Sequence, residues 1–291
     1  MTHLRIGTRG SPLALVQAGM VRDGLIAAHG ITAEIVVIRT TGDIVQDRPL
    51  AEIGGKALWT KELDRALLGG EIDCAVHSMK DVETVRPADI SIAAILPRAD
   101  VRDRLIGAAS IAALHQGATV GTSSPRRRAQ LLRIRPDLTI VSFRGNVDTR
   151  LAKLAAGEAD ATLLAAAGLE RLDRPDVGVA IALDVMLPAP AQGAVGIEIR
   201  KSDAAIHRLV SALDHAATHA SVLAERALLA ALHADCHSPV AALAHTDGTI
   251  RAELYAEDGS AHVAGSGNDP VMLAHDLLAR APASIRQLFA A

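Results

Sequence analysis

Short apolar runs alternate with amphipathic helical patterns from residue 3 to about residue 200. Apolar residues at every second position predict a strand, whereas apolar residues three and four positions apart predict a helix. The expected strands are 5–8, 31–39, 73–77, 90–95, 118–120, 138–143, 161–165, 179–183 and 195–199, and helices are expected over 13–29 and 60–68. Strands that are separated by helices predict an α/β fold with mainly parallel sheets.

Three of the expected strand-to-helix junctions carry arginine. The most complete is 121–128, GTSSPRRR, in which Ser124 is expected to cap a helix and Pro125 to occupy its first position. A similar order occurs in 9–12, RGSP, and in 143–146, FRGN. Ligands of an α/β sheet bind at the carboxyl ends of its strands, and free N–H groups at a helix start attract anions. Because arginine binds acids through two nitrogens, these turns indicate a ligand with several carboxylates or phosphates.

Composition limits what the arginines mean. Arginine outnumbers lysine 25 to 5, a bias that a GC-rich coding sequence also produces, so the positions of the arginines are more informative than their number. A single arginine triplet is ordinarily a solvated helix face, but here it is one of three such junctions. The formal net charge is -3 and the chain has four aromatic residues, which does not fit a nucleic-acid-binding protein.

The pattern divides the chain into three expected domains. A polar segment at 97–100 and a proline-rich segment at 188–193 are the expected crossings between the first two. Past residue 214 the pattern changes to a long helix, a loop, short strands and a final helix from about 271, which indicates a small α+β domain. The expected domains are 1–97 with 195–214, then 98–194, then 215–291. The stretch 40–57 has little periodicity and is expected to be a lid.

The N-terminal residues lack the uninterrupted apolar stretch of a signal peptide, and no apolar run is long enough to span a bilayer. The two cysteines, Cys74 and Cys236, are far apart in the sequence and form no Cys-x-x-Cys pair. Reduced thiols in a cytoplasmic protein are therefore expected, with no membrane partner.

An expected strand ends directly before a group of polar residues at 77–81, HSMKD. At the end of a strand in an α/β sheet, Lys80 and Asp81 would lie in the ligand crevice. In isolation Asp81 is an ordinary helix cap or surface carboxylate, and Lys80 a solvated amine. Among arginines that bind a ligand's acids, however, a single carboxylate can stabilise a developing positive charge. Asp81 is therefore a candidate catalytic residue.

The second cysteine, Cys236, lies in a polar, loop-like segment just beyond the long expected helix. A buried free thiol is the commonest environment of cysteine, and Cys74, inside an expected strand, fits it. Near Cys236, protonated histidines would favour the thiolate, whereas Asp235 would oppose it. A zinc site formed by His233, Cys236 and His237 lacks a clear fourth ligand and regular spacing.

Six separated segments resemble those of the porphobilinogen deaminase family, also called hydroxymethylbilane synthases, and occur in that family's order. They are 9–15, 76–81, 121–124, 144–147, 192–196 and the loop around Cys236, and they cover residues 4 to about 240. The resemblance implies a transferase that joins four porphobilinogen molecules head to tail, releasing ammonia at each step, to give linear hydroxymethylbilane for tetrapyrrole synthesis. It also implies two domains similar to periplasmic binding proteins flanking a cleft, and a third that presents Cys236.

The resemblance implies a role for each matched residue. It implies a dipyrromethane cofactor, made from two substrate units and held by a thioether to Cys236, whose thiolate can trap the electrophile left when ammonia departs. Asp81 is the implied catalytic residue, and no metal is implied. The implied cofactor-binding residues are Ser78, Lys80, Ser124, Arg126, Arg127, Arg144 and Cys236, and the implied substrate-binding residues are Arg9, Ser11, Lys56, Arg150 and Arg171. The basic ones would bind the acetate and propionate of each pyrrole.

The implied partners are the small-molecule substrate porphobilinogen and uroporphyrinogen-III synthase, which would receive the product from a cytoplasmic monomer. Neither a nucleic acid nor a membrane is an expected partner. Two other classes stay open. A non-catalytic anion-binding module would use the same arginines but gives Asp81 and Cys236 no role. A metal-dependent hydrolase would require stoichiometric metal and would lose activity to chelators.

Four positions depart from the residues that are common in the family. Glu83 stands where proline is common, Ala234 and Asp235 where two glycines are common, and Trp59 where phenylalanine is common. A negative charge beside an anion site predicts that Glu83 points away from it. The change at Asp235 alters the local charge and loop geometry expected around Cys236.

Overall fold

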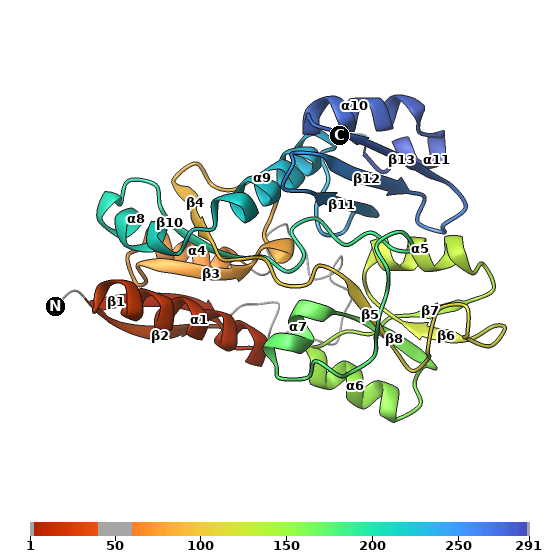
Figure 1. The fold of residues 1–291 in the computed structure, drawn as a ribbon, viewed down its shortest axis with the longest axis horizontal. Coiled ribbons are helices and arrows are strands. Elements are labelled where there is room, and N and C mark those ends of the chain that lie inside the picture. The colour runs from red at the N-terminus through yellow and green to blue at the C-terminus, as the bar shows by residue number, and fades with distance from the viewer. Residues whose placement is uncertain (1–2, 40–59, 290–291) are drawn as a thin grey trace. The chain divides into compact units, whose positions relative to one another are not determined.

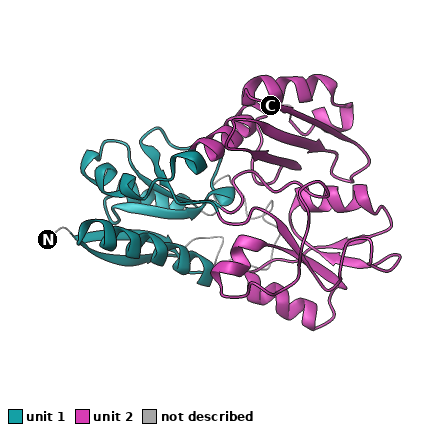
Figure 2. Cartoon of the chain, in the orientation of Figure 1, with its two compact units in different colours: residues 1–98, 194–219 teal, residues 99–193, 220–291 magenta. Residues whose placement is uncertain are grey.

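The computed structural model describes residues 3–39 and 60–289, and its contacts divide the chain into two compact units (Figures 1 and 2). Unit 1 comprises 1–98 and 194–219, and unit 2 comprises 99–193 and 220–291. The third boundary between the units, at residues 219 and 220, lies inside the long helix α9 (Ala216–Ala231). The expected lid at 40–57 lies outside the described residues.

Unit 1 is built on a mixed five-stranded sheet in the order β2-β1-β3-β10-β4 (Figure 1). Its strands are β1 (His3–Arg9), β2 (Thr32–Ile38), β3 (Cys74–Ser78), β4 (Ile90–Ile95) and β10 (Val195–Arg200). β1 runs parallel to β2 and β3, whereas β10 runs antiparallel to β3 and β4. Buried side chains of the sheet and of the first helix form its core, among them Leu4, Ile6, Leu25, Val76 and Ile197.

The longer helices of unit 1 begin and end where local sequence signals predict. Ser11 accepts a backbone N–H at the start of α1 (Pro12–His29), and Gly30 ends that helix with a φ of +61°. Gly69 follows the last residue of α4 (Lys61–Leu68). The shorter helical segments are η1 (Met79–Asp81), α8 (Ala204–Val210) and η2 (Ser211–Leu213).

Unit 2 contains a second five-stranded sheet, in the order β7-β6-β8-β5-β9. Its strands are β5 (Asp103–Ile106), β6 (Thr119–Gly121), β7 (Thr139–Val141), β8 (Ala161–Ala165) and β9 (Val179–Ala180), and its helices are α5 (Pro125–Ile134), α6 (Val147–Ala155) and α7 (Ala166–Arg171). β6 runs parallel to β7 and β8, and β5 runs antiparallel to β8 and β9. In both sheets the first three strands of the order are parallel and the fourth, β10 or β5, is antiparallel to them. This confirms the prediction of two similar α/β domains.

Unit 2 also contains an antiparallel sheet of β11 (Val240–Ala244), β12 (Ile250–Tyr255) and β13 (His262–Gly267). It shares a core with α9, α10 (Pro270–Arg280) and α11 (Ala283–Arg286) that includes Leu228, Leu254, Leu277 and Ile285. The Tyr255 hydroxyl also accepts a hydrogen bond from Gln130 of α5 at 3.3 Å. This is the expected α+β region. No helix in the described part of the chain is long and apolar enough to cross a membrane.

Three strands differ from the pattern-based prediction. β7 ends at Val141 rather than at Phe143, whose carbonyl accepts a hydrogen bond from the Ser123 side chain at 2.7 Å. β9 is also shorter than predicted, and β5 was not predicted at all. β5 begins with Asp103, which is only 2% exposed, and a buried acid breaks the alternation by which strands are predicted.

Candidate functional site

Two neighbouring strands of unit 1 end at candidate residues. β1 ends at Arg9 and β3 ends at Ser78, and because these strands are parallel, both ends lie at the same edge of the sheet. Nε2 of the buried Gln17 donates to Ser78 Oγ at 2.8 Å. Gln17 belongs to α1, the helix that Ser11 caps, so this hydrogen bond joins that helix to the end of β3.

The short helical turn η1 carries Lys80 and Asp81 directly after β3. Its first residue, Met79, donates its backbone N–H to Ala194 O at 3.0 Å. The Met79 side chain lies against Gly196 of β10, where a Cβ atom would come within 2.1 Å of the sulfur, so close packing requires glycine there. No ion pair from a described residue reaches the half-buried Asp81 carboxylate. The turn thus holds an uncommitted carboxylate at a fixed place in unit 1.

Glu83, the residue that stands where the family commonly has proline, is paired inside unit 1. Its Oε2 accepts a hydrogen bond from Arg86 Nη1 at 2.8 Å and another from the Thr60 hydroxyl at 2.5 Å. Its charge is therefore compensated by Arg86, as expected of a carboxylate that is not part of an anion site.

The turn at 121–124 has the local structure that its sequence predicts. Pro125 is the first residue of α5, and Ser124 Oγ accepts the N–H of Arg127 at 3.4 Å. The Phe143 ring lies on Gly121, where a Cβ atom would be 2.4 Å from the ring carbons. The GTSS and FRGN segments, which are separate in the sequence, therefore pack against each other.

Two of the three arginines that follow this turn are buried. Arg126 and Arg127 are 3% and 5% exposed, whereas Arg128 is exposed. Nη2 of Arg126 donates to one oxygen of Asp103 at 2.8 Å, and Nη2 of Arg127 donates to the other at 2.7 Å. Each Nη1 donates to a backbone carbonyl. We call Asp103, Arg126 and Arg127 the Asp103 cluster; it rules out the interpretation of this triplet as a solvated helix face.

The Asp103 cluster contains two guanidiniums and one carboxylate. Burial alone would raise the pKa of Asp103, but the charges and hydrogen bonds of the two arginines hold it far below its usual range. The Nε atoms of both arginines are buried without a hydrogen-bond partner in the described part of the chain. The cluster thus has a surplus positive charge and two unsatisfied N–H donors, a combination that suits an additional anion.

Three further arginines of unit 2 belong to the predicted site. Arg144 is half-buried, and among the described residues its buried Nη1 has no hydrogen-bond partner. Arg150 Nε donates to Gly145 O at 3.0 Å. Arg171 Nη2 donates to Gly193 O at 2.7 Å, and burial lowers the pKa of this arginine. The last bond joins α7 to the turn at Gly193, which belongs to another of the quoted segments.

The two cysteines lie in opposite environments. Cys74 is fully buried in β3, where burial raises the pKa of its thiol to about 12. Cys236 is exposed in the loop between α9 and β11. In that loop Asp235 accepts the N–H of His237 at 2.8 Å and donates its own N–H to Ser238 Oγ at 3.1 Å. Asp235 therefore shapes the loop, and no group of three metal-ligating side chains occurs among the described residues.

Sequence reasoning missed two residues that organise these groups. Asp103 gave no signal, because no motif contains it and its strand was not predicted. Gln192 lies in a quoted segment, but no role was assigned to it. Its Nε2 donates to Asp103 Oδ1 at 2.9 Å and to Val101 O at 2.7 Å, so it completes the shell of the Asp103 carboxylate.

Comparison with known proteins identifies the family. Residues 4–208 match the porphobilinogen deaminase, dipyrromethane cofactor binding domain, and residues 219–279 match the porphobilinogen deaminase, C-terminal domain. The chain belongs to the porphobilinogen deaminase family. The porphobilinogen deaminase of Sphingopyxis alaskensis is 59% identical, over 99% of this chain and 96% of its own length. That of Paracoccus denitrificans is 51% identical, over 96% and 95%. A chloroplastic porphobilinogen deaminase of Oryza sativa is 50% identical, over 88% and 75%.

Solved structures of low sequence identity were also compared. The VFT2 domain of Bordetella pertussis BvgS gives a TM-score of 0.44 at 16% identity, over 73% of this chain and 85% of that one. A Salmonella typhimurium periplasmic binding protein with high arginine specificity gives a TM-score of 0.42 at 13% identity, over 73% and 92%. The assignment to the α/β class rests on the strand orders given above.

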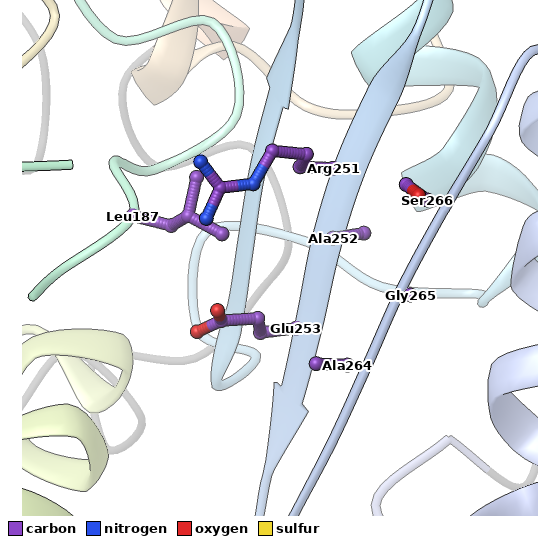
Figure 3. A pocket seen from close by; sticks show the side chains of 7 residues that line it. All are labelled: Leu187, Arg251, Ala252, Glu253, Ala264, Gly265 and Ser266. Carbon is purple, nitrogen blue, oxygen red and sulfur yellow. The ribbon is translucent and has the colours of Figure 1, made fainter. Parts of the chain in front are cut away.

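A pocket of about 310 Å³ lies on unit 2 beside β12 and β13 (Figure 3). Arg251 and Glu253 of β12 point to the side on which Leu187 lies, and small residues complete the lining. None of the predicted site residues lines this pocket. Two residues of the sequence-based site hypothesis, Lys56 and Trp59, lie outside the described residues.

Proposed function

We propose that this chain joins four porphobilinogen molecules head to tail, releasing ammonia at each step, into linear hydroxymethylbilane. The product would be built on a dipyrromethane primer that a thioether links to Cys236. Family membership over nearly the whole chain supports the reaction. The observation that carries the proposal is the Asp103 cluster, because surplus guanidinium charge with unsatisfied N–H donors suits a ligand rich in carboxylates.

The residues present fit a dipyrromethane cofactor. Cys236 offers an exposed thiol that can be alkylated. The unsatisfied N–H groups of Arg126, Arg127 and Arg144 suit the acetate and propionate groups on its rings. The proposed cofactor-binding residues are Ser78, Lys80, Ser124, Arg126, Arg127, Arg144 and Cys236. When bound, the cofactor supplies a pyrrole with a free α-carbon, to which substrate units are added.

A second set of residues is proposed to bind the acidic groups of the incoming substrate. It consists of Arg9, Ser11, Arg150, Arg171 and Lys56. Ser11 in this set and Ser124 in the cofactor set are both helix caps whose hydroxyl oxygens accept a backbone N–H. Each hydroxyl proton is not used by that bond, so both serines can also donate to a carboxylate.

Asp81 is the proposed catalytic residue. As the carbon–nitrogen bond of the aminomethyl group breaks and ammonia leaves, positive charge develops on the substrate pyrrole. The Asp81 carboxylate would accept a hydrogen bond from the pyrrole N–H and stabilise that charge. The new carbon–carbon bond forms at the α-carbon of the growing chain, and Asp81 would help to take up the proton that this carbon loses.

The proposal extends to the setting of the enzyme. We propose three domains, 1–97 with 195–214, 98–194 and 215–291, in a cytoplasmic monomer that passes its product to uroporphyrinogen-III synthase. The repeated sheet arrangement and the separate α+β core support the division into domains. Light scattering during size-exclusion chromatography measures the mass of the assembly, and a dimer would contradict the proposed monomer.

Intact-mass measurement with and without porphobilinogen tests the function. The purified chain should be heavier than its sequence by two pyrrolic units, and added substrate should produce stepwise heavier forms. The Cys236→Ser variant should lose this increment, whereas the matched Cys74→Ser variant should keep it. A normal increment in Cys236→Ser would contradict the anchor.

The same measurement separates the alternatives. A non-catalytic anion-binding module would have the mass of its sequence and would not consume porphobilinogen. A metal-dependent hydrolase would lose activity on chelation, whereas the proposed enzyme would not.

A further inference from the structure

The segment 82–89 joins η1, which carries Asp81, to β4, and it contains neither helix nor strand. A segment of this kind normally exposes long charged side chains. Arg86 is an exception, because its side chain is only 9% exposed. The interactions that bury it therefore fix the segment that follows the catalytic turn.

Every N–H of the Arg86 guanidinium has a partner. Nε and Nη2 donate to the two oxygens of Glu198, both at 2.8 Å. Nη1 donates to Glu83 at 2.8 Å and to Thr60 Oγ1 at 3.2 Å, and Nη2 also donates to Asp64. We call these five residues the Arg86 cluster. Its members come from the segment itself, from β10, and from α4 and its N-cap.

The Arg86 cluster contains more carboxylates than cations. The side chains of Asp64, Glu83 and Glu198 are 13%, 20% and 0% exposed, and all three approach one guanidinium. His77 Nε2 lies 3.2 Å from Glu198 on β3, the strand that leads into η1. Buried carboxylates repel one another unless a cation lies between them. Arg86 is therefore the group that allows the segment, α4 and β10 to come together.

We infer that Arg86 is a positioning residue for Asp81. β3 holds the start of the turn that carries Asp81, and Arg86 fixes the end of that turn by joining segment 82–89 to β10 and α4. This inference rests on the proposed role of Asp81. The guanidinium donors of Arg86 are all used within unit 1, so its removal should change how well Asp81 is placed rather than how well porphobilinogen binds. Small displacements of a catalytic group lower the rate of the chemical step strongly.

Steady-state kinetics of the purified holoenzyme test the inference. Arg86→Leu should lower kcat at least about tenfold and change KM by less than about twofold, because none of the proposed substrate-binding residues belongs to this turn. Arg86→Lys keeps the charge but not the five donors, so an intermediate loss of about threefold is expected. If Arg86→Leu does not fold, Arg86→Lys decides the question. The intact mass should retain the cofactor increment in both variants.

Arg5→Leu is the matched control in the same unit. The Arg5 guanidinium donates to Asp73 through two hydrogen bonds, at 3.1 and 2.7 Å, and neither residue belongs to the proposed site. The control should keep kcat within about twofold of the wild-type value. Hydrogen exchange of peptides that cover 79–86 should accelerate in Arg86→Leu and stay unchanged in Arg5→Leu.

Three results would overturn the inference. Both Arg86 variants could keep the wild-type kcat, KM could rise while kcat stays constant, or the Arg5 control could lose as much kcat as Arg86→Leu. A wild-type protein that does not condense porphobilinogen would instead refute the proposed function. In that case hydrogen exchange over 79–86 still shows whether Arg86 fixes the segment.

Discussion

The described part of each unit contains a buried cluster of arginine and carboxylate side chains, and these two clusters have opposite charge balance. The Arg86 cluster of unit 1 surrounds one guanidinium with three carboxylates. The Asp103 cluster of unit 2 surrounds one carboxylate with two guanidiniums. In the first, every guanidinium N–H is used, whereas in the second two Nε atoms have no partner among the described residues.

This difference separates an arginine with a structural role from the arginines that we propose bind a ligand. Both kinds are buried and both pair with carboxylates, so neither burial nor pairing distinguishes them. The number of unsatisfied N–H donors distinguishes them, because a buried N–H without a partner destabilises the protein until a ligand supplies an acceptor. The four predictions that follow concern these two clusters and the turns that lie next to them.

The largest expected effect is that of Asp81→Asn. Loss of the uncommitted carboxylate should lower kcat by about 10²- to 10⁴-fold, because charge stabilisation and proton transfer are needed in each condensation. The cofactor increment in the intact mass should persist, since the thiol and the Asp103 cluster are untouched. Asp89→Asn, at an exposed position in the same unit, is the control. Near-normal bilane production by Asp81→Asn would refute the catalytic role.

Asp103→Leu should be the most destabilising change. It leaves two buried guanidiniums next to each other without a counterion, which costs about 3–5 kcal/mol of unfolding free energy. Urea unfolding followed by circular dichroism measures the loss. The control is Asp137→Leu, which removes the partner of Arg135 near the surface of the same unit and should shift the midpoint much less. Equal shifts in the two variants would contradict the importance assigned to the Asp103 cluster.

The acid side of the stability curve should depend on Glu198. Burial alone would raise its pKa, but His77 and Arg86 lower it from 4.5 to about 2. A carboxyl group with a lowered folded-state pKa stabilises the fold above its unfolded-state pKa and loses that contribution as pH falls through the folded value. Ionised Glu198 should therefore contribute about 3 kcal/mol to the free energy of unfolding above pH 4.5, and this contribution should disappear toward pH 2.

Unfolding free energies of wild type and Glu198→Gln, measured from about pH 6 to about pH 3, check this expectation. The gap between the two proteins should narrow as pH falls. The pKa of Asp64, in the same cluster, is shifted in the opposite direction, because burial raises it despite the hydrogen bond from Arg86. The destabilisation caused by Asp64→Asn should therefore shrink toward neutral pH. If the difference in unfolding free energy between wild type and Glu198→Gln does not change with pH, the lowered pKa of Glu198 is wrong.

The smallest expected effects are those of two glycine substitutions, one in each unit. An added methyl group would meet Met79 in Gly196→Ala and the Phe143 ring in Gly121→Ala. Both should cost about 1–3 kcal/mol, with the larger cost at Gly121 because a ring yields less than a methionine chain. Only Gly196→Ala disturbs the Asp81 turn, so it should lower kcat more. Thermal unfolding measures the stability loss and steady-state kinetics measure kcat. A larger loss of kcat in Gly121→Ala than in Gly196→Ala would contradict the expectation that only Gly196 supports the Asp81 turn.

The sequence by itself determined the local structure of this protein. The Ser11 and Ser124 caps, the glycine that ends α1 and the order of most strands and helices follow from residues within a few positions of one another. The separated segments were also enough to indicate the family, because they combine many local requirements in one order.

Only the tertiary structure decided what the charged side chains do. The sequence presents Arg126 and Arg127 as part of a basic run, and it gives no reason to connect Arg86 with Glu198. The carboxylate that pairs with the first two begins β5, and the one that holds Arg86 lies in the returning strand β10. Periodicity and capping act over three or four residues, whereas ion pairs form between strands that only folding brings together. For that reason the sequence could name the basic residues, but could not tell which of them still lack a partner.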